Sequence, residues 1–358
     1  MDIHDLDMDA IVKRYELTLA RQNHDRPALH ITYPSGTKAQ QPPAPPTVRE
    51  RWFNFEWRIE CFERQLDEAA YFAEGFPTNW CNLGPDVLAG FTGSELDFSQ
   101  DGTSWAKFRV KDWSKEPPIR FQRQGRLWKE MEKFLVMSAE RGKGRWLTGS
   151  GDLHTNGDGL SALRGPEDLL MDLVDQPEEM KKRLAEFHEV FSQVLQAHFD
   201  IIHPRSARLN SSWLGATCRG RYAVIQNDFC CMVGPGMFDE FFKEYVEKEA
   251  ALLDHSIYHL DGPGAVRHLE SICASPHLDA IQWVPGAGNK PPAEWPELLK
   301  KIQSLGKGLW LYGSVQEAET MMKYLKPEGC IYGLWCSSKE EAQALVKTAE
   351  KIYGKKRK

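Results

Sequence analysis

Residues 308–335 read GLWLYGSVQEAETMMKYLKPEGCIYGLW, and this stretch decides the fold. Two short apolar runs, at 308–312 and 330–335, enclose an amphipathic segment. That segment opens with Ser314 and has Glu317 three positions later, the pattern of a capped helix start. One apolar helix face follows at a spacing of three or four, made by Ala318, Met321, Met322 and Leu325. The stretch therefore predicts a strand, a helix and a second strand parallel to the first.

The same unit recurs along the whole chain. Eight short apolar runs predict strands near 28–32, 78–82, 145–150, 222–227, 257–261, 280–284, 308–312 and 330–335. After the last run, Ser337-Ser338-Lys339-Glu340 predicts a second capping box. Strands that alternate with helices favour a parallel sheet covered by helices, and eight strands close a (β/α)₈ TIM barrel. A doubly wound sheet is the alternative, but Gly262-Pro263-Gly264 is a weak match to a dinucleotide fingerprint and indicates a tight turn.

We expect one α/β domain over residues 1–358, with an N-terminal helix within 1–25 and a basic tail over 350–358. Residues 33–47 and 86–118, rich in proline or glycine, break the regular pattern and predict long loops. Both follow a predicted strand, so both would lie over the catalytic mouth of a barrel.

Composition limits the partners that this protein can have. The formal net charge of −6 argues against nucleic acid as a partner, and no apolar run approaches the roughly 20 residues that span a bilayer. The start, Met1-Asp2-Ile3-His4-Asp5, does not resemble a signal peptide, so we expect a cytoplasmic protein. Its eight cysteines are then thiols or ligands rather than disulfides, with Cys230-Cys231 expected on an extended segment. A small-molecule substrate is expected, and the assembly is left open between a monomer and a homodimer.

In a barrel, side chains at the carboxyl ends of the strands converge on one site. The sharpest signal there is His259 and Asp261, because residues two apart on a strand point to the same face. Cys336, at the end of the eighth strand, would be the third ligand of a catalytic zinc ion with one open position. The alternative is a neutral His259 hydrogen-bonded to Asp261 with no metal, which spacing alone favours.

Three further residues at strand ends are candidate catalytic groups. Asp228 and Asp152 suit general acid–base chemistry or the binding of a cationic group, and His154 suits a proton shuttle. For each aspartate the alternative is a helix cap or a bond to loop amides, and for His154 it is simple solvation. We interpret Asp158 as a cap.

Other polar and aromatic side chains at the strand ends would line a pocket for a partly apolar organic substrate. The aromatic ones suit stacking on a planar ligand, although each could instead pack beneath a loop. The candidate substrate-binding residues are Asn79, Gln282, Trp283, Tyr312 and Trp335.

Several of these segments resemble the uroporphyrinogen decarboxylase superfamily. Residues 20–28, ARQNHDRPA, resemble the start of its chains, and 163–170 with 175–178 resemble its mid-chain helices. His259-Leu260-Asp261-Gly262 resembles the His-x-Cys-Gly motif of its corrinoid-dependent methyltransferase branch, with aspartate in place of the cysteine. Cys336 is similar to the final metal cysteine of that branch.

The resemblance implies a TIM barrel and, most directly, a zinc-dependent methyltransferase. Zinc held by His259, Asp261 and Cys336 would acidify a substrate thiol or hydroxyl, and a separate corrinoid protein or a small methyl donor would be the partner. The decarboxylase branch carries arginines after its first strand, whereas residues 30–35 here have none. Two alternatives remain: a metal-free decarboxylase or lyase acting through Asp228 or Asp152 on a tetrapyrrole or another carboxylated aromatic, and a barrel that only binds a tetrapyrrole or corrinoid.

Overall fold

The computed structural model describes residues 6–354, so the first five residues and the end of the predicted basic tail, 355–358, lie outside it. Each of the eight predicted strands coincides with an observed strand, and the others are short or antiparallel. The strands are β1 Ala28–Pro34, β2 Ala69–Ala73, β3 Thr78–Trp80, β4 Leu96–Asp97, β5 Trp105–Ala106, β6 Leu147–Gly149, β7 Leu209–Asn210, β8 Cys218–Arg219, β9 Tyr222–Gln226, β10 His255–Asp261, β11 Ala280–Val284, β12 Gly308–Gly313 and β13 Cys330–Trp335.

The main sheet is mostly parallel and has the strand order β2-β1-β13-β12-β11-β10-β9. A separate parallel pair joins β3 to β6, and Gly149 of β6 forms one bridge to Ser211 beyond β7. Strand β1 pairs with the antiparallel strand β2 and not with β3. Within residues 6–354 the pairing therefore does not form a closed ring, and the predicted closed barrel is not confirmed.

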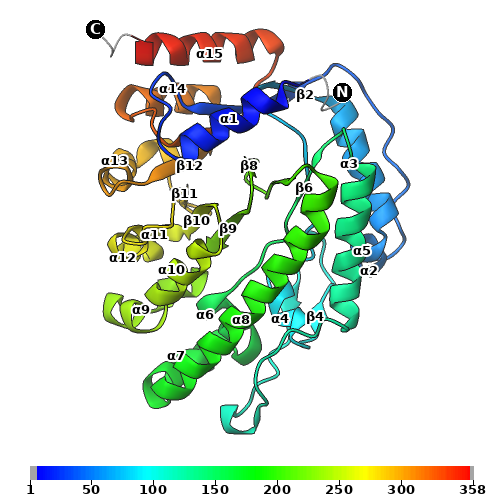
Figure 1. Ribbon diagram of the computed structural model, residues 1–358, viewed down its shortest axis with the longest axis vertical. Coiled ribbons are helices and arrows are strands. Elements are labelled where there is room, and N and C mark those ends of the chain that lie inside the picture. Colours follow the sequence, from blue (N-terminus) through cyan, green and yellow to red (C-terminus); the bar gives the residue numbers. More distant parts are fainter. Residues whose placement is uncertain (1–5, 355–358) are drawn as a thin grey trace.

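Helices surround these strands. Figure 1 shows α9 to α13 on one side of the strands and α3 and α5 on the opposite side. The α-helices are α1 Met8–Leu19, α2 Val48–Phe53, α3 Phe55–Glu68, α4 Val87–Phe91, α5 Arg126–Arg141, α6 Asn156–Arg164, α7 Pro166–Asp175, α8 Pro177–Ile202, α9 Pro235–Phe241, α10 Lys243–Ala251, α11 Gly262–Ala265, α12 Leu269–Cys273, α13 Pro296–Ser304, α14 Val315–Tyr324 and α15 Lys339–Gly354. Short 3₁₀ helices are η2 Trp113–Lys115, η3 His203–Arg205, η4 Asp228–Met232, η5 Val266–His268 and η6 Pro292–Glu294.

The predicted helix starts are largely confirmed. Ser314 and Glu317 form the capping box of α14. The second box is displaced by one residue, because the Ser338 hydroxyl accepts from the Glu341 backbone and the Glu341 carboxylate accepts from the Ser337 backbone. Residues 35–47 have no helix or strand, whereas the predicted loop over 86–118 contains α4, η2 and the hairpin β4–β5.

Strand alternation divides the core into two layers. The larger apolar cluster lies between the strands and the helices, and includes Leu260, Trp283 and Cys336. The smaller cluster joins the opposite faces of the strands, where Ile257 and Ile331 meet Tyr15 of α1. Helix α1 thus covers the space enclosed by the strands near their amino ends, so polar side chains gather at the carboxyl ends. No helix among residues 6–354 combines the length and apolar character needed to cross a bilayer.

Candidate active site

Several candidate residues lie on one face of the β9–β11 ladder. In the parallel register His259 of β10 lies beside Gln226 of β9 and Gln282 of β11. Asp261, two residues beyond His259, ends the same strand on the same face. Strand pairing therefore brings the candidate residues of three strands together at the carboxyl ends, as the sequence predicted.

A possible metal site is formed by Asp228, His259 and Asp261. Each offers one ligand atom, and these atoms all lie within 4.8 Å of one another. All three side chains are partly buried. A tetrahedral zinc ion holds its nitrogen and oxygen ligands roughly 3.3 Å apart, so these three side chains would have to draw together to hold one and would leave its fourth position open.

The position of Asp228 depends on a second carboxylate. Asp158 in α6 accepts hydrogen bonds from the backbone N–H groups of Asp228 and Phe229, at 2.8 and 2.6 Å, and so caps η4. Burial, together with the charge of Asp158, raises the pKa of Asp228 to about 7, against the opposing effect of His259 and His154. The buried Oδ1 atom of Asp228 has no hydrogen-bond partner among the described residues. A cation would satisfy both the charge and this oxygen.

The orientation of His259 is set by Gln282. The Nδ1 atom of His259 lies 2.6 Å from the Gln282 side-chain oxygen, and therefore donates to it. This fixes the tautomer and leaves Nε2 as the free lone pair. The metal-free alternative predicted a hydrogen bond from His259 to Asp261. His259 instead forms its hydrogen bond with Gln282.

Asp152 and His154 lie beside this group. Asp152 accepts from the Gln226 amide, and the His154 Nε2 atom is 3.8 Å from Asp152 while its Nδ1 atom is 3.9 Å from Asp86. Burial opposes protonation of His154, but the surrounding carboxylates outweigh it and raise its pKa. His154 is therefore a partly buried, charge-paired group rather than a solvated loop histidine.

Two predicted substrate-binding residues share the face of His259. Burial, together with the charge of the nearby Asp261 carboxylate, raises the pKa of Tyr312 of β12. Trp335 ends β13 and is 59% exposed. Gln282, predicted to contact substrate, instead supports His259.

Cys336 requires a correction, because the structure does not bring it to His259 and Asp261. It belongs to the layer between strands and helices, with Tyr332 and Leu334, and its backbone N–H donates to Thr32. Burial raises the pKa of its thiol to about 11. Alternation places Trp335, not Cys336, on the face of the polar group, and Asp228 takes the third ligand position.

Asn79 and Trp283 also lie on the helix side of their strands. The Asn79 amide donates to Ser138 of α5 at 3.0 Å, and Trp283 is fully buried against Trp295. Neither faces the polar group, so the prediction that they bind substrate is corrected. For Trp283 the preceding residue, Gln282, faces the group instead, because successive side chains on a strand alternate.

The sequence predicted no place at the site for three of its neighbours. Trp213, between β7 and β8, lies against the His259 ring with centroids 6.4 Å apart, and no periodic pattern marks it. Cys230 and Cys231 lie in η4 and not on an extended segment, and the Cys231 thiol donates to the Asp261 backbone oxygen. The 3₁₀ helix forms because Asp158 binds its first N–H groups, a contact from 70 residues away in sequence.

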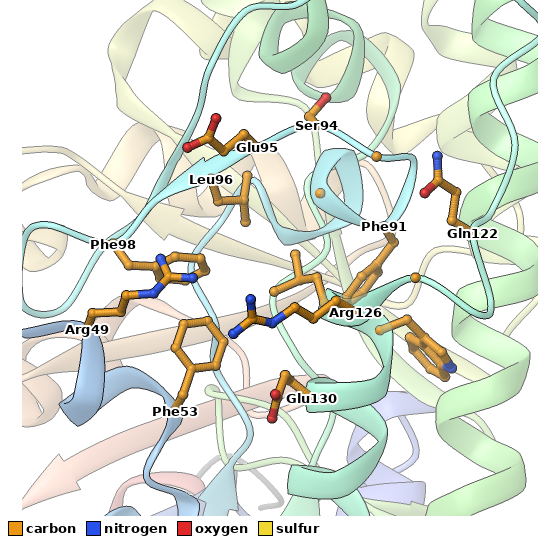
Figure 2. A pocket seen from close by; sticks show the side chains of 15 residues that line it. Arg49, Phe53, Phe91, Ser94, Glu95, Leu96, Phe98, Gln122, Arg126 and Glu130 are labelled. Atoms are coloured by element: carbon orange, nitrogen blue, oxygen red, sulfur yellow. The ribbon is translucent and has the colours of Figure 1, made fainter.

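A separate hollow of about 260 Å³ lies between α2, α4 and the start of α5. Its walls include Phe53 and Phe98, and Figure 2 shows that Arg49 from α2 and Arg126 from α5 both point toward it. None of the predicted site residues lines this hollow, so it is distinct from the candidate active site.

Comparison with known proteins supports the architecture alone. No protein-family model matches the chain, and no curated protein sequence matches it. Among solved structures, the chain is similar to a methyltransferase from Methanosarcina mazei, with a TM-score of 0.63 and 14% sequence identity. The similarity covers 96% of this chain and 99% of that chain. At this identity, the match shows a shared fold from end to end.

Proposed function

We propose that this protein is a metal-dependent, methyltransferase-like enzyme whose ion is held by Asp228, His259 and Asp261. The observation that carries this proposal is the convergence of one imidazole and two carboxylates at the carboxyl ends of the strands. The shared fold with a methyltransferase and the His-x-Asp-Gly motif at residues 259–262 support it. We also propose that the chain belongs to the uroporphyrinogen decarboxylase superfamily. Its single domain would then be an open form of that superfamily's barrel.

The residues present suit a divalent ion. The free Nε2 of His259 and the unpartnered Oδ1 of Asp228 are ligand atoms without another use among residues 6–354. One nitrogen and two carboxylate donors suit zinc, and are harder than a set with two thiolates. When bound, such an ion supplies Lewis acidity that lowers the pKa of a substrate thiol or hydroxyl.

The remaining groups bind, orient and move protons. Gln282 holds the His259 ring, and Asp158 holds Asp228 through the start of η4. His154, whose pKa is raised, is placed to exchange a proton at Nε2 on the side of Asp152. We propose a small-molecule substrate, and a corrinoid protein or a small methyl donor as the second reactant.

A metal-free lyase is the second candidate, and one observation favours it. Burial and Asp158 raise the pKa of Asp228 to about 7, so this carboxyl group would hold a proton near neutrality and could donate it to an intermediate. This role requires Asp228 to remain free of metal.

Metal analysis separates the two candidates. The purified protein is equilibrated with zinc, freed of excess ion and analysed by mass spectrometry. We expect one ion per chain, and a loss of at least 100-fold in affinity for His259→Ala. Cys336→Ser is the matched control and should retain the ion, because Cys336 lies outside the group. Retention by His259→Ala, or loss by Cys336→Ser, would contradict the proposed ligand set.

The reaction is tested separately, with free methylcobalamin and a panel of thiols and phenols under anaerobic conditions. Transfer of the methyl group to the sulfur or oxygen leaves cob(I)alamin, which is followed by its visible absorption. Zinc-dependent conversion supports the methyltransferase. A protein that binds no metal and converts none of these compounds would count against it.

A further inference from the structure

A cavity of about 350 Å³ fills the space between β1 and β3, where the strands are not paired. His30 of β1 lines one side, and Thr78 and Trp80 of β3 line the other. The gap exists because β1 pairs with the antiparallel strand β2 instead. We call this the seam cavity.

Aromatic rings form much of its wall. Trp80 and Trp213 lie with their ring centroids 5.7 Å apart and their planes tilted by 42°. Phe76 packs edge-on against His30 at 5.1 Å, and Tyr71 of β2 completes the lining at the seam. Rings of this kind bind flat, apolar ligands by stacking and edge contacts.

The lining carries no charge at neutral pH. It contains no carboxylate, lysine or arginine. Burial lowers the pKa of His30 to about 4, and burial raises the pKa of Tyr71 to about 12, so both are neutral. A ligand carboxylate would lose its hydration here and find no cationic partner, which disfavours anionic ligand groups.

The seam cavity and the proposed metal site share one wall. Trp213 lines the cavity and also meets the His259 ring edge-on, with an interplanar angle of 77°. Trp213 therefore connects the cavity to the polar group, and a ligand ring held against Trp213 would be separated from His259 by no more than this side chain.

We propose that the seam cavity binds the flat, uncharged ring of the substrate. This inference rests on the proposed function for its meaning, since it names the substrate class of that enzyme: a compound of one or two rings without a carboxylate group. The volume lies at the lower end of the range for small-molecule pockets and suits such a compound. A tetrapyrrole with several carboxylates does not match this cavity.

Binding to the metal-free protein tests the inference without any assay of turnover. The probes are 2-methoxyphenol and benzoate, followed by quenching of tryptophan fluorescence and by calorimetry. We expect 2-methoxyphenol to bind at least tenfold more tightly than benzoate. Equal or tighter binding of benzoate, or no binding of 2-methoxyphenol, would overturn the proposal.

Variants locate the binding site. Trp80→Leu should weaken 2-methoxyphenol binding about tenfold. Trp105→Leu, a matched change at an exposed tryptophan outside the cavity, should not alter it. If Trp80→Leu fails to fold, Trp80→Phe keeps a smaller ring and should show a weaker loss in the same direction. Unchanged binding in the folded Trp80 variant would overturn the location.

The outcomes separate this inference from the proposed function. Neutral-ring binding by a chain that takes up no metal would leave the cavity assignment standing while the metal site fails. Metal uptake without neutral-ring binding would leave the proposed metal site standing while the cavity assignment fails.

Discussion

The two halves of the strand assembly differ in regularity. Strands β9 to β13 form an uninterrupted parallel ladder that ends in Asp261, Gln282 and Tyr312. Across β1, β3 and β6 the ladder is broken, with β2 turned antiparallel and the seam cavity in the gap. In the ladder, the alternation of side chains along each strand places the polar groups on one face. The broken half contains the seam cavity, which is lined by aromatic side chains. The comparison suggests that reactive groups and ligand volume come from different halves, and the following variants test its first part.

The largest effect on stability is expected at Trp283, and it tests which face of the ladder each side chain occupies. Trp283 is fully buried on the helix side, so Trp283→Ala should lower the free energy of unfolding by about 3–5 kcal/mol. Trp335, 59% exposed on the opposite face, should change it by no more than about 0.5 kcal/mol when replaced by alanine. Urea unfolding measures both. Similar losses in the two variants would show that the faces are assigned wrongly.

A smaller, pH-dependent effect is expected at Asp228. Its pKa is about 7 in the folded metal-free protein, against 3.8 for an ordinary aspartate. The folded state holds a proton that the unfolded chain has released, so this group's contribution to stability falls as pH rises from about 4 to 7. Asp228→Asn removes that loss, and should raise the unfolding free energy by on the order of 2–4 kcal/mol at pH 8. Near pH 4 the gain should vanish, and an equal gain at both pH values would argue against the raised pKa.

The smallest effect is expected at Gln282, which contacts the proposed metal ligand His259 and not the metal ion itself. Gln282→Leu removes the acceptor for His259 Nδ1 and should weaken zinc binding 10- to 100-fold in calorimetry. Gln282→Glu keeps an acceptor at the same place and should restore most of the affinity. If leucine and glutamate behave alike, the orienting role of this side chain is refuted.

The sequence predicted the regular half well. All strands from β9 to β13 were located, because each is a short apolar run, and β12 and β13 are also followed by capped amphipathic helices. His259 and Asp261 were paired correctly, since a spacing of two on a strand fixes a common face. The same alternation rule places Cys336 on the other face of the strand, with Tyr332 and Leu334. The resemblance of Cys336 to a metal-binding cysteine led to the wrong prediction.

The broken half was less predictable, for physical reasons. β2 follows the end of α3 directly, and its five residues carry no turn signal that announces an antiparallel return. Asp158 was interpreted as a cap for a neighbouring helix, whereas it caps η4 across a long sequence separation. Trp213 lies between two-residue strands, where neither periodicity nor composition predicts a role.

Strand β2 also affects how the chain behaves toward other copies of itself. By pairing with His30 to Tyr33, it occupies backbone groups that would otherwise form an exposed sheet edge. Exposed edges recruit strands from other molecules and start aggregation. The edge of the sheet thereby passes from the seven-residue β1 to the five-residue β2, and a short edge strand recruits partners less readily. Loss of the β2 pairing would expose the longer edge and increase self-association at high concentration.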